Sequence, residues 1–249
     1  NPEKYLLFKK QRTQPAIDLA ARAAGCCKPQ TIADIGCGPG NSTAVLKSVF
    51  PNARILGIDS SEAMIGRAKA EHPDMTFAVC RAQELTGRYD LLFSNACLQW
   101  IPDHDVLIPA LMGRLNAGGV LAVQMPRNQS EPLYRIISEV AADPAWHVEH
   151  VKAQEREVPS PEEYFDILSR CSSGFELWET TYYHVLPSHE HLVEWVRATR
   201  LRPYLEALSG PEKEAFEREI LNRARQAYAA TESGEVVFRF RRFFFIAHR

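Results

Sequence analysis

Three glycines at alternate positions are the residues best suited to hold a small ligand. They lie in "TIADIGCGPGNSTAVL" as Gly36, Gly38 and Gly40, between an apolar run and a run with helical spacing. Glycine has no Cβ and tolerates positive φ, so such a turn brings the backbone close to a ligand. The N-terminus of the following helix favours negative groups. The stretch therefore predicts a ligand-binding turn between a strand and a helix.

Two carboxylates near these glycines indicate which ligand binds. Asp59 closes the next apolar run, where it can accept hydrogen bonds from both hydroxyls of a ribose. Asp34 lies two residues before the first glycine, where a carboxylate suits a cation better than a pyrophosphate. The dinucleotide fingerprint is incomplete because Asn41 replaces its third small residue, and no triphosphate-binding loop is present. We therefore expect S-adenosylmethionine, which carries ammonium and sulfonium charges.

Two other clusters have simpler explanations. His184, His189 and His191 resemble a zinc-ligand set, but they cross a strand-to-helix turn, and capping or surface positions explain them better. "FRFRRFFFIAHR" could stack bases, yet a core strand with one solvent face is simpler. The net charge of −2 also argues against bulk electrostatic binding to nucleic acid. We expect neither a metal site nor a nucleic-acid partner.

Strands and helices that must position these residues alternate through residue 126. Apolar runs separated by helical spacing predict strands at 31–36, 54–60, 75–80, 89–96 and 119–126. This alternation is typical of a parallel sheet covered by helices on both faces. Asn41 or Ser42 is expected to cap the helix after the glycines, and Ser60 or Ser61 the next one.

The pattern changes after residue 126. A helical run is followed by a loop-rich polar stretch at 154–164, a long strand at 174–186, two helical runs and a final strand. We expect the helical block to cover the carboxyl edge of the sheet. The predicted organisation is one domain over 1–249, with an N-terminal lid segment at 1–30, a cofactor-binding core at 31–126, a remaining strand and helical substrate cap at 127–234, and a final strand at 235–249.

Composition places the chain among ordinary globular proteins. Of its 249 residues, 45% are hydrophobic and 24% charged. No apolar run reaches membrane-spanning length, and "NPEKY" does not resemble a signal peptide. The six cysteines contain no CxxC pair, which is typical of reduced thiols. We predict a cytoplasmic monomer or weak dimer with no membrane contact.

Several segments resemble a known family. "DIGCGPG" with "GIDSSEAMIGRA" resembles the class I methyltransferases that use S-adenosylmethionine. "SNACLQWIPDH", "GGVLAVQMPRNQSEP", "TTYYHVLPSHEHLVEWV", "LRPYL" and "YLLFKKQRTQPAIDL" together resemble the trans-aconitate 2-methyltransferase family over nearly the whole chain. The resemblance implies a Rossmann-like α/β fold with a mostly parallel seven-stranded sheet, an antiparallel last strand and a helical cap. It also implies methyl-ester formation on a tricarboxylic acid, with S-adenosylhomocysteine as the product.

The resemblance also implies which residues bind the cofactor. Asp34 and the glycines would lie along the methionine moiety, and Asp59 would hold the ribose. Met64 would cover one adenine face, and Asn95 would lie beside the sulfur. The predicted cofactor-binding residues are Arg12, Asp34, Gly36, Cys37, Gly38, Gly40, Asp59, Ser60, Met64, Ala82, Gln83 and Asn95.

Two positions depart from the family pattern. Arg81 stands where an aspartate often contacts the adenine amino group. We expect main-chain atoms around Ala82 and Gln83, or the side chain of Gln83 or Glu84, to replace that contact. Arg200 stands where the family has glycine, which narrows the pocket or adds a cation.

Arginines and hydroxyl donors form the predicted acceptor site. A tricarboxylate needs fixed cations or donors, and the planar fork of arginine suits carboxylates best. Strand alternation turns Tyr182 and His184 to the same face. The predicted substrate-binding residues are Tyr5, Arg12, Trp100, His104, Tyr182, Tyr183, His184, Arg202 and Arg242.

The implied reaction needs no general base, because a carboxylate is already ionised at neutral pH. We therefore assign no catalytic residue in the strict sense. Two alternatives remain open. A methyltransferase acting on a hydroxyl, amine or carbon would need a base such as His104 or His184. A non-catalytic protein that senses S-adenosylmethionine would be favoured if Arg81 or Arg200 blocked the pocket.

Overall fold

The computed structural model describes residues 2–152, 158–197 and 199–249, with only the backbone described at 2–12 and 152. The chain forms two compact units. The first unit comprises Asn1–Pro126, Glu157–Thr180 and Arg242–Arg249, and the second comprises Arg127–Arg156 and Thr181–Arg241. These boundaries differ from the expected cap at 127–234, because residues 157–180 belong to the first unit and residues 235–241 to the second.

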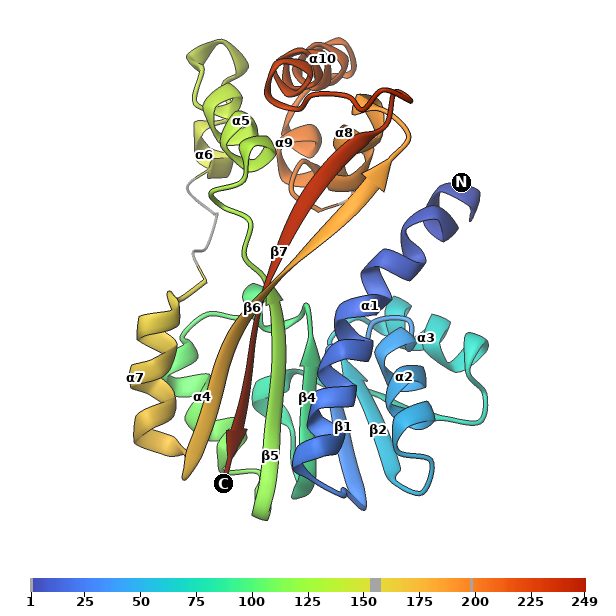
Figure 1. Cartoon of the computed structure of the whole chain (residues 1–249), viewed down its shortest axis with the longest axis vertical. Helices are drawn as coiled ribbons and strands as arrows, with labels where there is room; N and C mark the ends of the chain where they lie inside the picture. The colour runs from blue at the N-terminus through green and yellow to red at the C-terminus, as the bar shows by residue number, and fades with distance from the viewer. Residues whose placement is uncertain (1, 153–157, 198) are drawn as a thin grey trace. The chain divides into compact units, whose positions relative to one another are not determined.

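A seven-stranded sheet has the order β3-β2-β1-β4-β5-β7-β6 (Figure 1). Its first five strands pair in parallel, and β7 pairs antiparallel to β5. This confirms the predicted α/β class with an antiparallel last strand. The strands are β1 (Thr31–Ile35), β2 (Arg54–Asp59), β3 (Thr76–Val79), β4 (Tyr89–Asn95), β5 (Leu115–Pro126), β6 (Gly174–Leu186) and β7 (Val236–His248).

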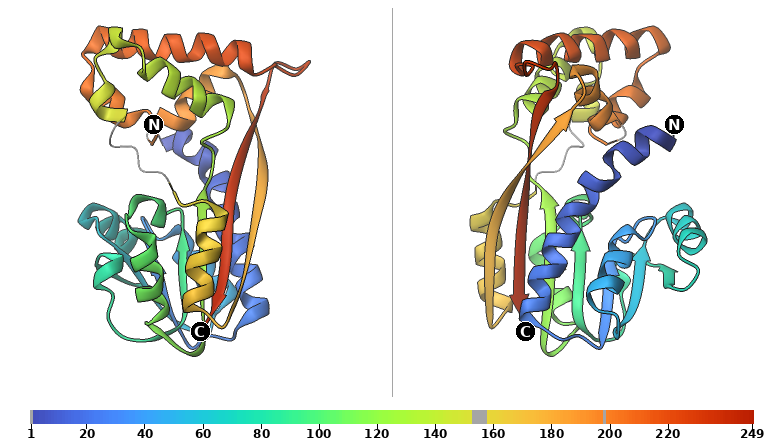
Figure 2. Two further views of the ribbon diagram at one scale, coloured as in Figure 1. Left: turned by 90° about the vertical axis from the view of Figure 1, so that its left-hand side faces the viewer. Right: turned by 45° about the vertical axis from the view of Figure 1, so that its right-hand side comes forward.

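Helices cover both faces of the sheet in the first unit (Figure 2). α1 and α2 lie on one face, and α4 and α7 on the other. On the second face, Leu107 of α4 and Tyr164 of α7 pack with Val123 and Met125 of β5. The helices are α1 (Pro2–Cys26), α2 (Asn41–Val49), α3 (Glu62–Glu71), α4 (His104–Met112) and α7 (Pro161–Cys171), with single 3-10 turns η1 (Ala82–Glu84) and η2 (Leu98–Trp100).

α7 corrects one sequence expectation. The polar stretch at 154–164 was expected to be loop-rich, but helix α7 begins within it. Ser160 starts this helix through a capping box, in which its hydroxyl accepts from the Glu163 amide and the Glu163 carboxylate accepts from the Ser160 amide. The capping box satisfies two amides that a helix start otherwise leaves unpaired.

The second unit contains residues 181–186 of β6, residues 236–241 of β7 and the helices around them. Trp195 stacks on His184 with ring centroids 4.7 Å apart and meets Phe238 and Phe240 edge-on. These aromatic rings form the core of the unit. Its helices are α5 (Pro132–Ala141), η3 (Pro144–Trp146), α6 (Glu149–Lys152), α8 (His189–Arg197), α9 (Arg202–Ala207) and α10 (Gly210–Ala227).

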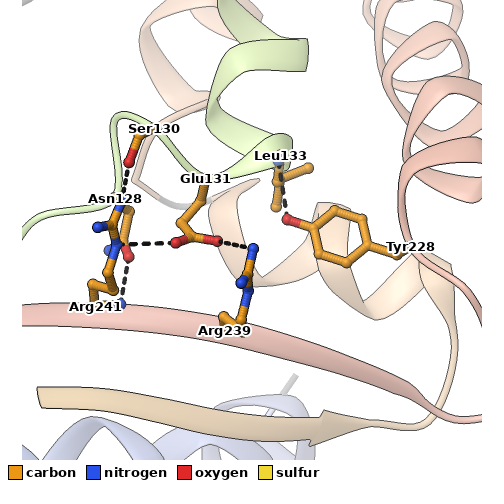
Figure 3. A network of polar contacts seen from close by, with 7 residues as sticks. All are labelled: Asn128, Ser130, Glu131, Leu133, Tyr228, Arg239 and Arg241. Atoms are coloured by element: carbon orange, nitrogen blue, oxygen red, sulfur yellow. Dashed lines mark hydrogen bonds and ion pairs between the residues drawn. The ribbon is translucent and has the colours of Figure 1, made fainter.

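A polar network fixes the start of α5 to β7 in this unit (Figure 3). The buried carboxylate of Glu131 lies 3.0 Å from Arg241 Nε and 3.5 Å from an Arg239 Nη. Asn128 Oδ1 accepts from the Arg241 amide at 2.7 Å, and Tyr228 Oη accepts from an amide in the first turn of α5 at 3.0 Å. Arg239 and Arg241 neutralise a carboxylate that burial would otherwise make costly.

Candidate functional site

The glycine turn lies at the carboxyl ends of β1 and β2. The amides of Gly36 and Cys37 both donate to the Ile58 carbonyl, at 2.8 and 2.9 Å, which folds the turn back over β2. Gly36 has φ +73°, and a Cβ there would lie 2.2 Å from Cys97 Sγ. Gly38 has φ +55°, but a Cβ there would meet none of the described residues within 4 Å. The turn therefore needs glycine at Gly36 for packing, and it leaves the Gly38 backbone open to a ligand.

Asp34 is a fully buried carboxylate just before this turn. Its Oδ2 accepts from Ser42 Oγ at 2.7 Å and Thr43 Oγ1 at 2.6 Å. Its Oδ1 is buried without a hydrogen-bond partner in the described part of the chain. Burial raises the pKa of Asp34 to about 6, although the two hydroxyl donors lower it. An acceptor held in this way suits a cationic ligand.

The capping prediction for α2 is wrong, because the Ser42 hydroxyl donates to Asp34 and does not cap the helix. Neither Asn41 nor Ser42 is the N-cap, because that position belongs to Gly40 at φ +91°, without a side-chain cap. The Ser42 hydroxyl binds Asp34 instead of a helix amide. The prediction for α3 is confirmed, since Ser61 is its N-cap and accepts from the Met64 amide at 3.3 Å.

Asp59 at the end of β2 ties the two turns together. Its Oδ2 accepts from the Gly38 amide at 3.0 Å, and its Oδ1 accepts from the Ser61 amide at 2.9 Å. Each carboxylate oxygen has a second lone pair that can accept from a ligand hydroxyl. Asp59 thus sets the shape of the glycine turn and offers the acceptors expected for a ribose.

The predicted adenine-binding residues lie on the same edge of the first unit. Met64 near the start of α3 is 43% exposed, and Ser60 is also exposed. Ala82 and Gln83 of η1 line a cavity of about 550 Å³ between η1 and α4. Arg81 is the exposed N-cap residue of η1. Ser60 and Met64 thus follow β2 along the chain, and Ala82 and Gln83 follow β3, so their contact with adenine stays a prediction.

Asn95 and Gln124 add a feature that the sequence predictions missed in part. They are register partners on β4 and β5, and the side chain of Gln124 is fully buried. Asn95 Oδ1, Gln124 Nε2 and Gln124 Oε1 are all buried without a partner among the described residues. The sequence did contain a sign of this feature, because Gln124 is a polar residue inside the apolar run "VLAVQMP".

Cys37 and Cys97 lie at the glycine turn as protonated thiols. Burial raises the pKa of Cys97 to about 12, and it raises the pKa of Cys37 as well. Since the thiolate is the reactive form of cysteine, neither residue is poised as a nucleophile. The predicted role of Cys37 in cofactor binding thus rests on its backbone position.

His104, which is predicted to contact the substrate, is buried and has both ring nitrogens engaged. It is 5% exposed, its Nε2 lies 2.9 Å from the Leu98 and Ile101 carbonyls, and its Nδ1 lies 2.5 Å from Tyr164 Oη. Two carbonyls can only accept, so Nε2 carries the proton and Nδ1 accepts from the tyrosine. Both ring nitrogens are therefore engaged in joining η2 to α7.

Removal of the Tyr164 hydroxyl tests this structural role. We expect Tyr164→Phe to lower the free energy of unfolding by about 1–2 kcal/mol, because buried His104 Nδ1 loses its donor. Chemical denaturation measures this change, and steady-state kinetics of the folded variant should match those of the parent. A raised KM with unchanged stability would assign His104 to the substrate instead.

The other predicted substrate residues are divided between the two units. Trp100 in the first unit is 66% exposed, and Arg242 is buried near the end of β5 opposite Pro126. Tyr182 and His184 share one face of β6 in the second unit, as alternation predicts, with ring centroids 6.4 Å apart. Tyr183 lies on the opposite face and is 65% exposed, so it cannot face the same ligand as Tyr182.

Three positions complete the set. The exposed Arg202 of α9 pairs with Glu206 at 2.7 Å, which resembles a solvated surface arginine. Tyr5 and Arg12 belong to α1, but their side chains lie outside the described residues. Nowhere in the described ranges do three His, Cys, Asp or Glu side chains gather as a metal site. Within the same ranges no helix has the length and apolarity needed to cross a membrane.

Similarity to known proteins identifies the family. The methyltransferase domain model matches residues 32–119. Trans-aconitate 2-methyltransferase of Escherichia coli (strain ATCC 8739) is 42% identical over 251 aligned residues, which cover 100% of this chain and 98% of that protein. The chain belongs to the trans-aconitate 2-methyltransferase family. The enzyme of that name from Shigella flexneri shows the same identity and coverage.

Solved structures agree on the fold of this trans-aconitate 2-methyltransferase family member. YcgJ protein from Bacillus subtilis has a TM-score of 0.61 at 13% identity, over 95% of this chain and 98% of that one. The plantazolicin methyltransferase BpumL, solved with S-adenosylhomocysteine, has a TM-score of 0.56 at 16% identity, over 97% and 86%. At such identities the likeness concerns the fold alone, and it confirms the predicted class I methyltransferase architecture.

Proposed function

We propose that this protein transfers a methyl group from S-adenosylmethionine to a carboxylate of a small polycarboxylic acid, with trans-aconitate as the first acceptor to test. The proposal rests on the polar side chains of one face of the sheet. Val123 and Met125 of β5 and Phe243 and Phe245 of β7 pack with α4 and α7. Alternation then turns Gln124 and Arg242 to the opposite face.

Asp34 and Asn95 share that face at the carboxyl ends of β1 and β4. Ala33, Ile35 and Leu92 belong to the core on the other side, so the same alternation applies to both strands. Two unpaired acceptor oxygens, Asp34 Oδ1 and Asn95 Oδ1, therefore lie on the same side as the buried guanidinium of Arg242. The hydrogen-bond acceptors on β1 and β4 suit a cationic methyl donor, and the guanidinium on β7 suits an anionic substrate.

The residues present fit the proposed cofactor. S-adenosylmethionine, when bound, supplies an electrophilic methyl group on a cationic sulfonium. Asp34 Oδ1 offers a dry, charged acceptor to the ammonium group, and Asp59 offers its remaining lone pairs to the ribose hydroxyls. The open backbone at Gly38 leaves room beside the turn.

The raised pKa of Asp34 predicts a pH dependence of cofactor binding. A protonated Asp34 attracts a cation less than the carboxylate does, so affinity should rise as the pH increases through about 6. The pKa of Asp34 in the folded protein lies above the ordinary aspartate value of 3.8, so the protein without cofactor loses stability as the pH rises between these two values. We expect about tenfold weaker binding at pH 5 than at pH 7.

Calorimetric titration with S-adenosylhomocysteine between pH 4.5 and 7.5 measures this dependence. Asp34→Asn should flatten the profile, because asparagine has no proton to lose in this range. Affinity that stays constant or increases as the pH falls would contradict the role of Asp34.

The protein's own contribution to transfer is positioning. The acceptor acid is ionised at neutral pH, so no side chain has to remove a proton. Arg242 can hold an acceptor carboxylate through two parallel hydrogen bonds, which fixes its orientation. A buried setting strengthens these contacts and excludes water from the reacting atoms.

Two alternatives have less support. A hydroxyl or amine acceptor needs a base, and His104 has both ring nitrogens engaged, while His184 stacks on Trp195 in the second unit. A sensor without activity would need a blocked pocket. Arg81 is exposed, and Arg200 lies 5.7 Å from the Tyr134 ring and donates to Ser138 at 3.5 Å.

We also propose that the protein acts in the cytoplasm as a monomer or weak dimer on a small molecule. Six free cysteines support a reducing compartment. Binding of acids to the S-adenosylhomocysteine complex tests the acceptor class by calorimetry. We expect trans-aconitate to bind more tightly than a monocarboxylate of the same length, whereas equal or absent binding of both would contradict the proposal.

A further inference from the structure

Gln124 is a buried amide in the middle of an otherwise apolar strand. Its neighbours on β5 from Val120 to Met125 are all apolar and buried, and its own side chain has no exposed surface. Neither its Nε2 nor its Oε1 has a hydrogen-bond partner among the residues that the structure describes. Packing alone does not explain a glutamine here, since a methionine of similar length would fill the space without an unpaired amide.

Asn95 lies beside Gln124 in register on β4. Register partners on parallel strands point to the same face, so the two amides are neighbours on the face opposite α4 and α7. Asn95 Oδ1 is also buried and unpaired within the described ranges, although Asn95 as a whole is partly exposed. The pair can therefore be reached from the Asn95 side.

The unpaired atoms carry an energetic cost. Each buried donor or acceptor without a partner costs roughly 1–3 kcal/mol relative to a paired one. Native proteins pair the great majority of such groups, and exceptions concentrate where a ligand or an ordered water completes the bonds. Three unpaired atoms on two adjacent residues therefore indicate a binding position.

The surroundings indicate what binds there. Gln124 pairs with Phe244 on β7, and Arg242 follows two residues along on the same face, opposite Pro126. Trp178 stacks on Phe244 with ring centroids 5.0 Å apart and 8° between planes. The amide thus lies beside the stacked Phe244 and Trp178 rings, and Arg242 follows Phe244 about 7 Å farther along β7. A neutral donor beside a guanidinium suits a carboxylate oxygen.

We propose that Gln124 is a specificity-determining residue that donates a hydrogen bond from Nε2 to an oxygen of the acceptor acid, beside Asn95. This assignment rests on the proposed carboxyl methyltransferase function. Arg242 supplies the positive charge that neutralises one carboxylate. Gln124 donates a hydrogen bond that depends on where the oxygens of the acid lie, and it adds no charge. The amide position then discriminates between acids of equal charge.

Gln124→Met tests the proposal through two readouts. Methionine keeps the length and removes the unpaired amide, so the melting temperature of the cofactor-free protein should stay the same or rise by about 2–6 °C. The KM for the acid should rise at least about tenfold, since a hydrogen bond to a charged group is lost. The affinity for S-adenosylhomocysteine should not change.

Ser94→Ala is the matched control, because Ser94 is the buried polar residue just before Asn95. Its hydroxyl donates to the Ile35 carbonyl at 3.1 Å, so its loss should lower the melting temperature and leave the KM unchanged.

Three results would overturn the assignment. A lower melting temperature of Gln124→Met with an unchanged KM would make the amide structural. Weaker S-adenosylhomocysteine binding with an unchanged KM would assign the amide to the cofactor. A parent protein that methylates no acid would overturn the proposed function itself, and this result is separate because it appears before any variant is made.

Discussion

Gly36→Ala is expected to abolish measurable cofactor binding and to destabilise the protein. The new Cβ would lie 2.2 Å from Cys97 Sγ and 2.3 Å from Cys97 Cβ, and alanine disfavours the φ of +73°. The turn must shift away from the Ile58 carbonyl that holds it. We expect a loss of more than about 100-fold in S-adenosylhomocysteine affinity, and a loss of about 2–4 kcal/mol in the free energy of unfolding.

Gly38→Ala is the matched comparison, because Gly38 lies in the same turn with φ +55° but an open Cβ position. The free energy of unfolding of Gly38→Ala should fall by only about 1 kcal/mol, the cost of the strained backbone. Its cofactor affinity should still decrease, because the new methyl group would occupy the space that we assign to the ligand. Calorimetry and chemical denaturation measure both quantities. Equal stability losses in the two variants would contradict the packing explanation for Gly36.

Arg242→Ala is expected to lower kcat/KM for the acceptor acid by about 10²–10³-fold. Truncating one partner of a buried charge pair leaves the other charge unpaired, which costs about 2–5 kcal/mol in such contacts. Arg242→Lys should recover part of the loss, because lysine keeps the charge but cannot form two parallel hydrogen bonds. Cofactor affinity serves as the measure of correct folding in both variants.

Arg249→Ala is the control for loss of an arginine from the same end of the chain. Arg249 follows β7 at its other end and donates to the Gly113 and Leu115 carbonyls. Its removal should leave kcat/KM unchanged. If Arg242→Ala binds cofactor normally and retains kcat/KM within threefold of the parent, the acid does not use Arg242.

The fold was predictable from the sequence because its signals are local. The glycine turn, the closing acid Asp59 and the alternation of strands and helices each occupy a short stretch. The N-cap of α2 was not predictable in this way. Ser42 is a good capping residue by type, but its hydroxyl serves Asp34, and this competition depends on the folded turn. The capping box of Ser160 and Glu163 was readable, yet the polar composition around it favoured a loop.

The sequence could indicate site positions that belong to a local motif. It could not indicate those whose surroundings depend on contacts between residues far apart in the chain. His104 has a side chain suited to catalysis, but its contact with Tyr164 joins residues 60 positions apart, which the sequence alone could not show. Tyr183 is exposed on the face of β6 opposite Tyr182, so its contact with the substrate stays a prediction. Gln124 becomes visible only when its register with Asn95 and its unpaired amide are known.

The most direct test is methyl transfer from labelled S-adenosylmethionine to a panel of trans-aconitate, cis-aconitate, isocitrate and citrate, followed by alkaline hydrolysis of the product. We predict a base-labile methyl ester, formed preferentially on trans-aconitate. Binding of S-adenosylmethionine without a methyl ester on any of these acids would contradict the proposed function and direct the search to amine and hydroxyl acceptors.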